Sequence, residues 1–535
     1  MHWADVAASN LAQRGSKHII ASGITPSGEF HIGHIREILT GEIITRACRH
    51  IGLDVEFIFI VDSADPLRKV YPFLHQDYEQ YIGHQIGNIP PPDEDGKPDV
   101  HRFETTGATY AQYFLEPFLL ALHEIGVQPR LVDNLEMYRA GKFEPYAKQV
   151  CENKEVVREI IERVSGRELP EDWFPWTPLD SHGKLGNVKI IDYHHPIVSF
   201  EETDGTHGTS DISKGEGKLP WRIDWPARWC FNEITMEPFG KDHGTSGGSY
   251  DTGKEIVEFF GYEAPNPLTY EWISLKGMGA MSSSVGNTIG PMEALRLVPP
   301  EILRLLVAKT KPSKAIEFDT GMGLVTLADE YERLASRNFE DELLQPDLSR
   351  RQTVQIEDAE ASMRYAVVHQ GEKAKSESVT FRHLAMLAQI RDSDEEVFES
   401  LLETEMITEV SSTLRDRLRR MRYWISSQHF PVDMQIRLQS EPSKFFFDHA
   451  NELDFNILRV MHEHFATIPW TSQDIHGVFG LIAEQLGVNM REVYRASYIL
   501  FLGAEKGPRL APILEAWHRD LAMQLLKSIL DENQL

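Results

Sequence analysis

The sequence predicts an α/β domain with a doubly wound parallel sheet, interrupted by an insertion and followed by an α-helical bundle. Lys17 to Ala21 is typical of a short buried strand, and a small-residue turn separates it from apolar residues at helical spacing between Ile35 and Ala47. Val55 to Val61 is a nearly continuous apolar run, as expected for a central parallel strand that is buried on both faces. From Phe381 to Leu535 successive segments have a helical period and few strand candidates, so these helices must pack together.

Length and cysteine content narrow the class of protein. At 535 residues the chain is too long for one hydrophobic core, and we expect three or more domains. Cys48, Cys151 and Cys230 are far apart and form no CxxC pair, so we expect neither a disulfide framework nor a cysteine zinc site. There is no cationic start followed by an apolar segment, and no apolar run is long enough to span a bilayer. We therefore expect a soluble, cytoplasmic protein with no membrane partner.

The charge balance is acidic, with a formal net charge of −28 from 82 acidic and 54 basic residues. Taken alone, this balance argues against a nucleic-acid partner, and we expect no DNA partner. A large protein can nevertheless gather its lysines and arginines on one face while acidic residues solvate the others. The net charge therefore does not exclude an RNA partner.

The turn from Ser22 to His34 carries glycines and two histidines between the first predicted strand and helix. A helix that begins at such a turn directs unpaired N–H groups and the positive end of its dipole at the space in front of it, where phosphate is the usual ligand. His31 and His34 are one helical turn apart, so both imidazoles can face the same bound group. The alternative is that both are ordinary surface or capping histidines.

Charged residues follow the second predicted strand, at the edge where doubly wound sheets bind ligands. Asp62, Asp65, Arg68 and Lys69 could line a pocket at this edge. The alternative for Asp65, which precedes Pro66, is that it only begins a turn.

Residues 95 to 215 are predicted to form an insertion between two halves of the sheet. Gly87 to Pro98 is rich in glycine, proline and acid and is predicted to be an exposed loop. Helical spacing returns from Phe103 to Ile125, and Gly141 to Val164 is predicted to be a long polar helix. Gly183 to Gly217 is rich in glycine and polar residues, and we expect a flexible ribbon or loop there.

The insertion contains His182, His194, His195 and His207. A structural zinc site without thiolates needs four well-spaced ligands, and nothing in the sequence enforces that spacing. We therefore predict no metal site in the protein.

A tryptophan-rich segment, Lys218 to Trp229, follows the insertion. Trp221 and Trp225 offer flat apolar walls, and Asp224 places a carboxylate among them. Such a lining suits a ligand with an apolar stem and an ammonium group, and Trp225 is the preferred pocket residue. The alternative is that the tryptophans pack a core and Asp224 makes a structural ion pair.

A glycine-rich loop, Glu237 to Ser249, comes next between a strand-like run and a helix. Its glycines permit close approach of a ligand to the backbone, and Asp242 could accept hydrogen bonds from ribose hydroxyls. A simple connecting loop is the alternative.

Several of these motifs together resemble one enzyme family. His31-Ile-Gly-His34, after a strand and the turn Thr25-Pro-Ser-Gly28, resembles the HIGH motif of class I aminoacyl-tRNA synthetases. The run GITPSGEFHIGHIREILTGE, residues 23 to 42, resembles the class I lysyl-tRNA synthetases in particular, and Gly240-Lys-Asp-His243 resembles their GKDH element. Val488 to Ile513 resembles the helical anticodon-binding region of glutamyl-tRNA synthetases, which the class I lysyl enzymes share.

The resemblance implies a Rossmann-like catalytic domain and a two-step reaction. ATP and L-lysine would give lysyl-adenylate and pyrophosphate, with Mg²⁺ on the phosphates, and the lysyl group would then pass to the 3′ end of tRNA(Lys). The catalytic residues that the resemblance implies are His31, His34, Ser282, Ser283 and Ser284. The implied ATP-binding residues are Gly33, Gly240, Asp242 and Met281, and the implied lysine-binding residues are Gly23, Thr25, Trp225, His243 and Tyr270.

One motif departs from the family pattern. Class I synthetases have a mobile KMSKS loop whose lysines hold pyrophosphate, and the lysyl branch commonly reads KMSSS. Here the first position is Ala280 and the fourth is Ser283, so neither motif lysine is present. Backbone N–H groups and serine hydroxyls can still bind phosphate, and Lys276 could reach in. Two alternatives therefore stay open: a non-catalytic tRNA-binding relative, and an adenylate-forming enzyme for another acid such as glutamate.

Two regions beyond this loop are candidates for contact with tRNA. Lys309 to Phe318 is basic and suits the inner elbow of tRNA, although a solvated loop would look similar. Near the C-terminus, Tyr494, Tyr498 and Phe501 could stack on anticodon bases or could belong to the core. We expect five parts: residues 1–94 and 216–290 as the two halves of the catalytic domain, 95–215 as the insertion, 291–375 as a connector and 376–535 as a helical anticodon-binding domain.

Overall fold

The computed structural model describes residues 1–186, 188–277, 279–280 and 288–532. The chain divides into two compact units. The first unit comprises Met1–Leu295, Pro300–Phe318 and Arg337–Ala374, and the second comprises Arg296–Pro299, Asp319–Ser336 and Lys375–Leu535. Residues of the predicted connector, 291–375, occur in both units, and the five expected parts remain a prediction.

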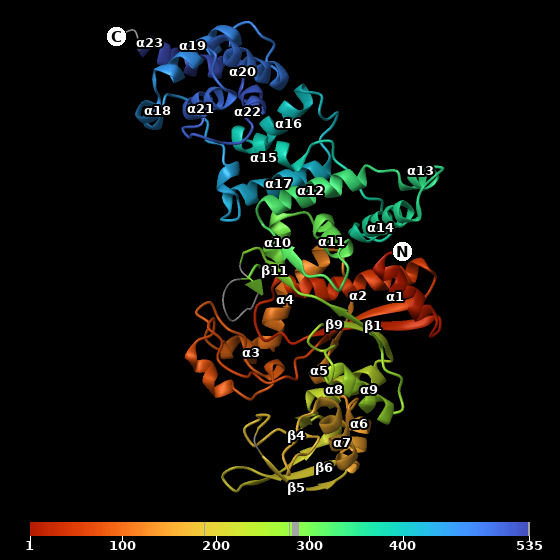
Figure 1. The fold of residues 1–535 in the computed structure, drawn as a ribbon. Helices are drawn as coiled ribbons and strands as arrows, with labels where there is room; N and C mark the ends of the chain where they lie inside the picture. Colours follow the sequence, from red (N-terminus) through yellow and green to blue (C-terminus); the bar gives the residue numbers. More distant parts are fainter. Residues whose placement is uncertain (187, 278, 281–287, 533–535) are drawn as a thin grey trace. The chain divides into compact units, whose positions relative to one another are not determined.

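A five-stranded parallel sheet forms the centre of the first unit (Figure 1). Its strands are β1 (Lys17–Ile24), β2 (Asp54–Val61), β3 (Arg130–Asp133), β9 (Ile234–Gly240) and β10 (Asn266–Tyr270). They lie in the order β10-β9-β1-β2-β3, and every neighbouring pair is parallel. The predicted doubly wound topology is confirmed, and the order of the strands reverses between β1 and β9, where sheets of this kind bind ligands at their carboxyl edge.

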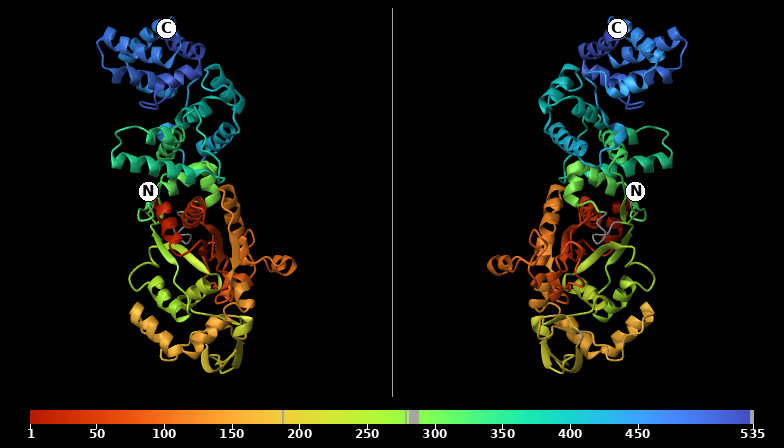
Figure 2. Two further views of the ribbon diagram at one scale, coloured as in Figure 1. Left: turned by 90° about the vertical axis from the view of Figure 1, so that its right-hand side faces the viewer. Right: turned by 90° about the vertical axis from the view of Figure 1, so that its left-hand side faces the viewer.

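Helices cover both faces of this sheet. α1 (Trp3–Ala12) and α2 (Ile32–His50) lie on one face, and α8 (Trp221–Phe231) and α9 (Ser249–Phe259) lie on the other (Figures 1 and 2). The apolar residues at helical spacing in α2, including Ile35, Ile38, Leu39, Ile43 and Ile44, are all buried. Because α2 begins directly after the turn that follows β1, its N-terminus lies at the carboxyl edge of the sheet.

Between β2 and β9 the chain contributes β3 to the central sheet and forms a series of smaller elements. They are η1 (Gln76–Tyr81), η2 (Ile86–Asn88), α3 (Val100–Thr106), α4 (Tyr110–Glu124), α5 (Asn134–Arg139), α6 (Glu144–Glu152), α7 (Lys154–Ser165), β4 (Thr177–Pro178), β5 (Lys189–His194), β6 (Ile197–Glu201), β7 (His207–Asp211), η3 (Ile212–Lys214) and β8 (Gly217–Lys218). The helix predicted over 141–164 is divided into α6 and α7, because Asn153 leaves the helical conformation with φ −125° and ψ 38°.

The prediction of a flexible ribbon or loop over residues 183–217 is wrong. β5, β6 and β7 form a three-stranded antiparallel sheet (Figure 1). Val198 and Phe200 alternate toward the protein interior and are buried, whereas the polar residues of β5 face solvent. A side chain at Gly208 would meet the Phe200 ring at 2.5 Å, so this glycine reflects close packing within the sheet.

A second small sheet and further helices complete the first unit. The strand-like run 268–275 is divided between β10 and β11 (Ile273–Leu275), which belong to different sheets. β11 pairs in antiparallel fashion with β12 (Gly279–Ala280) and in parallel with β13 (Ile316–Phe318). The remaining helices are α11 (Pro300–Ala308), α13 (Phe339–Leu343) and α14 (Arg350–Ala366), and α10 (Pro291–Leu297) lies at the junction of the two units.

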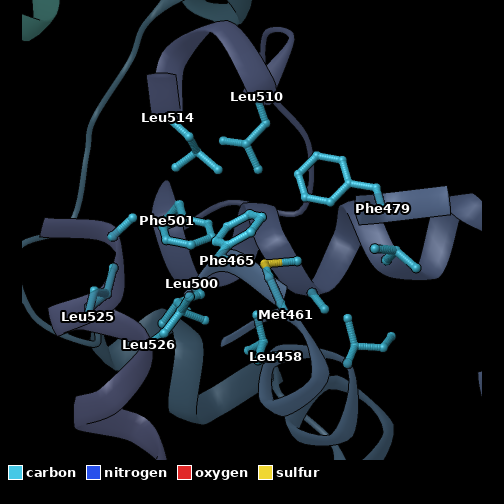
Figure 3. Close-up of a cluster of buried hydrophobic side chains, with 14 of the residues drawn as sticks. Leu458, Met461, Phe465, Phe479, Leu500, Phe501, Leu510, Leu514, Leu525 and Leu526 are labelled. Carbon is cyan, nitrogen blue, oxygen red and sulfur yellow. The ribbon is translucent and has the colours of Figure 1, made fainter. Parts of the chain in front are cut away.

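The second unit is helical in the part of the chain that the structure describes, which confirms the predicted bundle. Its helices are α12 (Met322–Ala335), α15 (Phe381–Ile390), α16 (Asp394–Glu403), α17 (Ser412–Ser426), α18 (Lys444–His449), α19 (Glu452–Phe465), α20 (Ser472–Leu486), α21 (Met490–Phe501), α22 (Leu510–Trp517) and α23 (Arg519–Glu532), with a short η4 (Val432–Met434). A core of leucine, phenylalanine and methionine side chains joins α19 to α23, as Figure 3 shows for Met461, Phe465 and Leu500. Phe501 is part of this core, whereas Tyr494 and Tyr498 are only partly buried against it. None of the helices formed by the described residues has the length and hydropathy needed to cross a membrane.

Candidate active site

The two histidines of the predicted phosphate site cap the N-terminus of α2. His31 is the N-cap residue, and its Nδ1 accepts a hydrogen bond from the Gly33 amide at 3.1 Å. The His31 amide in turn donates to Nδ1 of His34 at 3.1 Å, so the two residues form a reciprocal capping box. The ring centroids are 4.1 Å apart, which brings the predicted pair to one place at the carboxyl edge of the sheet.

These hydrogen bonds define which nitrogen of the His31 ring carries the proton. Because its Nδ1 accepts from a backbone N–H, the neutral His31 imidazole carries its proton on Nε2. Nδ1 of His34 lies 3.1 Å from the His31 amide nitrogen and 3.2 Å from the His31 carbonyl oxygen, so these contacts fit either tautomer of His34. Burial lowers the pKa of His31 to about 4, and burial together with the neighbouring His31 lowers the pKa of His34 to about 3. Both rings are therefore neutral hydrogen-bond donors at physiological pH, not cations.

Gly33 is required by this arrangement. A Cβ atom at this position would lie 2.6 Å from Cε1 and 2.7 Å from Nδ1 of His31, in the space that the capping ring occupies. A small residue between the histidines is thus a consequence of the capping geometry. The predicted role of Gly33 in binding ATP is not tested by this contact and remains a prediction.

Two of the predicted lysine-binding residues gather around a carboxylate that the sequence analysis missed. Glu37 lies one turn after His34 on α2, and it accepts hydrogen bonds from the Ser22 hydroxyl at 3.2 Å, from the Tyr270 hydroxyl and from the Gly23 amide. Burial raises the pKa of Glu37 to about 7 despite these three donors. The signal in the sequence was the spacing of Glu37 from His34, because residues three apart share one face of a helix.

The other two aromatic members of the predicted lysine site lie beside a second missed carboxylate. Glu237 of β9 accepts hydrogen bonds from Nε1 of Trp225 at 3.0 Å and from Nε1 of Trp229 at 2.6 Å. Burial raises the pKa of Glu237 to about 7, and its charge also acts on Glu37. The His243 ring centroid is 5.4 Å from that of Trp225, so these two predicted residues are brought together. An acidic residue within an apolar strand was the signal that could have identified Glu237.

Thr25 contacts a different group, a buried network of charges at the ends of β1 and β2. Its hydroxyl donates to Asp65 at 3.1 Å, and Lys218 Nζ lies 2.8 Å from Asp65 and 3.4 Å from Asp224. Arg228 pairs with both Asp224 and Asp62, and Tyr138 donates to Asp224. Although burial favours its neutral form, Arg228 and Lys218 lower the pKa of Asp62 to about 2. The geometry supports the structural alternative for Asp224, which makes buried ion pairs.

The predicted nucleotide residues of the glycine-rich loop lie at the end of β9. Asp242 is exposed to solvent, where it is accessible to a ribose. A Cβ atom at Gly240 would lie 3.2 Å from the ring of Trp272, so this glycine provides room for the indole. Met281, Ser282, Ser283 and Ser284 lie outside the described residues.

A small cavity of about 50 Å³ lies beside His34. Its lining residues are Thr25, Ser27, Gly28, Glu29, Phe30, His34, Tyr71 and Phe73. Within the described parts of the chain, no three His, Cys, Asp or Glu side chains are grouped so that they could hold a metal ion. The site thus offers hydrogen-bond donors at a helix N-terminus, and the carboxylates of Glu37 and Glu237 lie near one another on α2 and β9, an arrangement suited to a phosphate ester and a cationic ligand.

Comparison with known proteins agrees with this arrangement. A family model described as tRNA synthetases class I (K) matches residues 1–363. A lysine–tRNA ligase of Thermoplasma acidophilum is 35% identical over 100% of this chain and 99% of its own length. Lysine–tRNA ligase 1 of Methanosarcina acetivorans is 35% identical over 97% of this chain and 96% of its own, and the Methanocaldococcus jannaschii ligase is 34% identical over 98% and 99%. Members of this family use ATP as a substrate. The chain belongs to the family of class I tRNA synthetases of the (K) type.

Proposed function

We propose that this protein is a lysine–tRNA ligase that converts L-lysine and ATP to lysyl-adenylate and transfers the lysyl group to the 3′ end of tRNA(Lys). The observation that carries the proposal is the pair of neutral histidines at the N-terminus of α2, at the carboxyl edge of a doubly wound sheet. The similarity to lysine–tRNA ligases over the whole chain supports the same function. We also propose that it works in the cytoplasm, where tRNA is used.

In the first step the lysine carboxylate would attack the α-phosphorus of ATP, and pyrophosphate would leave. This chemistry depends mainly on positioning and on stabilisation of the charge that develops on phosphate oxygens. His31 and His34 would donate from Nε2 to these oxygens, together with the N-terminal amides of α2. Because both histidines are neutral, they contribute directed hydrogen bonds and not net charge.

Mg²⁺ would accompany the nucleotide. The donor set fits an ion held chiefly by the phosphates, since no metal-ligating cluster occurs in the described part of the protein. It would neutralise part of the phosphate charge. The exposed Asp242 would bind the ribose, and Gly33, Gly240, Met281 and the serines Ser282, Ser283 and Ser284 would bind the rest of the nucleotide and its pyrophosphate.

The lysine ligand would lie between the two buried carboxylates. Glu37 would accept the side-chain ammonium, while Tyr270 and Trp225 would contact the apolar stem. Gly23, Thr25 and His243 complete the proposed pocket. An ammonium ion beside Glu37 would favour its ionised form, whereas a carboxylate ligand would meet two like charges.

The two carboxylates beside the proposed pocket favour lysine over glutamate as the activated amino acid. A glutamate side chain would have to enter between Glu37 and Glu237, both of which burial already disfavours as anions. The absence of lysine at Ala280 and Ser283 would suit a relative that has lost the reaction. The intact capping pair favours a working enzyme.

The proposal is tested by charging purified tRNA(Lys) with labelled lysine and, in parallel, tRNA(Glu) with labelled glutamate. Formation of lysyl-tRNA(Lys) and no glutamyl-tRNA is the expected result. Binding of tRNA(Lys) without any charging would identify a non-catalytic relative, and charging with glutamate would identify the other alternative.

A further inference from the structure

Because both lysines of the KMSKS motif are replaced, another cation is needed to bind the leaving pyrophosphate. Ala280 and Ser283 stand at the two lysine positions. Phosphate groups in class I activation carry several negative charges, and a charge-assisted hydrogen bond to one of them is roughly twice as strong as a neutral one. A basic residue elsewhere at the same edge of the sheet could supply this charge.

The segment from Leu67 to His75 lies directly against the turn that precedes α2. A Cβ atom at Gly28 would lie 2.8 Å from the Phe73 ring, so the ring packs onto the turn at this glycine. Tyr71 stacks on Phe73 with ring centroids 5.5 Å apart and an angle of 3° between the planes. Both aromatic rings line the cavity that also contains His34. The segment therefore forms one wall of the space in front of the histidine pair.

Lys69 holds an ammonium group at this wall. Its side chain is exposed, and Nζ lies 5.3 Å from the centroid of the Tyr71 ring. Among the residues that the structure describes, no carboxylate is within ion-pair distance of it. A cation–π contact at an exposed site is weak, so the ammonium can leave the ring for a phosphate. Arg68, next to it, is 76% exposed and lies 3.8 Å from Asp65, which is engaged more closely by Lys218.

Other basic side chains at this edge are engaged within the protein. Lys218 and Arg228 are buried among Asp62, Asp65 and Asp224. Lys241 Nζ lies 2.7 Å from the Glu271 carboxylate. Arg36 is buried and donates to the backbone carbonyls of Trp272, Lys311, Pro312 and Lys314. Lys69, in contrast, is exposed and lies against Tyr71, whose ring lines the cavity beside His34.

We propose that Lys69, assisted by Arg68, binds the β- and γ-phosphates of ATP and the leaving pyrophosphate, and so supplies the charge that the motif lysines provide in other class I synthetases. Glu29, whose side chain is exposed, also lines the cavity. The inference rests on the proposed function, because it assigns a residue to the same activation reaction.

The test compares Lys69→Gln and Lys69→Arg with the wild-type protein. Two quantities are measured: the dissociation constant of ATP by calorimetry without tRNA, and the rate of lysine-dependent pyrophosphate exchange with tRNA(Lys). Lys69→Gln should weaken ATP about tenfold and slow exchange by about 10- to 100-fold, without changing the KM for lysine. Lys69→Arg should restore most of both. Lys148→Gln, at an exposed lysine on α6, is the matched control and should change neither.

A second comparison links Lys69 to the missing motif lysine. Adding Ser283→Lys to Lys69→Gln should recover part of the exchange rate, because one cation replaces the other. An unchanged dissociation constant of ATP in Lys69→Gln would overturn the inference. So would a loss of tRNA affinity alone, or a larger loss of ATP binding and exchange in Lys276→Gln than in Lys69→Gln. Failure of the proposed function would give a different result, namely no lysine-dependent exchange in the wild-type protein. In that case the dissociation constant of ATP would still show whether Lys69 binds the phosphates.

Discussion

At the scale of single residues, the site depends on neutral histidines and on carboxylates that burial keeps close to neutrality. His31 serves two roles at once, because Nδ1 caps α2 while Nε2 is left to donate. Capping uses only Nδ1, so a role in capping alone would give Nε2 no function. The two roles can be separated, since asparagine is a good N-cap residue but cannot place a donor where the imidazole Nε2 lies.

We expect His31→Asn to keep the stability of the protein within about 1 kcal/mol and to lower the rate of lysine activation by about 100-fold. Thermal unfolding and pyrophosphate exchange measure the two effects. At saturating lysine, the activation rate of the wild-type enzyme should not change through the pKa of an ordinary histidine near pH 6.5, because burial lowers the pKa of His31 to about 4 and that of His34 to about 3. An asparagine variant with full activity would reduce His31 to a structural cap.

Glu37 gives the site a pH dependence of defined sign. Its pKa is raised to about 7, so the carboxylate is ionised above this pH and protonated below it. Since the lysine ammonium binds the ionised form, the affinity for lysine should be highest above pH 7 and should fall as the pH decreases through 7. Equilibrium binding of lysine between pH 5.5 and 8.5 measures this dependence.

Glu37→Gln should bind lysine weakly at every pH and lose the dependence. Glu237 is the matched control, because burial also raises its pKa to about 7 but its hydrogen-bond partners are the indoles of Trp225 and Trp229. If Glu237→Gln abolishes the pH dependence and Glu37→Gln retains it, the ammonium site has been assigned to the wrong carboxylate.

At the scale of elements, a buried network of ions holds the ends of β1, β2 and α8 together beneath the site. Lys218 is the cation shared by Asp62, Asp65 and Asp224. Removing one partner from such a network leaves uncompensated charge in the interior. The network thus makes the position of Thr25 at the end of β1 dependent on residues far along the chain.

Lys218→Met should destabilise the protein by about 3–5 kcal/mol, measured by denaturant unfolding. Lys214→Met is the control, because Lys214 pairs with Asp211 at 3.0 Å but is 68% exposed. Its effect should be small, because solvent screens this exposed ion pair. Similar losses in both variants would mean that the buried network contributes no more than a surface ion pair.

How far the sequence predicts these elements depends on the range of the contacts involved. The strand, turn and helix around His31 follow from local spacing, and the structure has them as predicted. Glu37 was missed because its partners Gly23 and Tyr270 are brought to it by the sheet and not by sequence proximity. The sheet of residues 189–211 was missed because its polar composition hides an alternation in which only Val198 and Phe200 are inward.

At the scale of the whole molecule, the helical unit contains a hydrophobic core of its own. The helical core brings together side chains from α19 to α23, including Phe465 and Leu500 (Figure 3). The proposed nucleotide and lysine sites lie entirely in the first unit, between β1 and β10. Damage to the helical core should therefore affect the two substrates and the tRNA differently.

Phe465→Ala should cost the helical unit about 3–5 kcal/mol of stability. We expect weaker binding of tRNA(Lys) with unchanged affinity for ATP, measured by filter binding and calorimetry. Leu481→Ala, at a side chain that is 51% exposed on α20, is the control for stability and should have little effect. Loss of ATP affinity in Phe465→Ala would contradict the assignment of the nucleotide site to the first unit.

The central claim, that this chain activates lysine despite its altered loop, is tested most directly by exchange of labelled pyrophosphate into ATP. The assay is run with lysine, with glutamate and with no amino acid, each with and without tRNA(Lys). We predict exchange that requires lysine, and the arms with and without tRNA(Lys) show whether activation also requires the tRNA. The absence of exchange under every condition, in a protein that binds tRNA(Lys) tightly, would contradict the account and identify a relative that has kept the fold and lost the reaction.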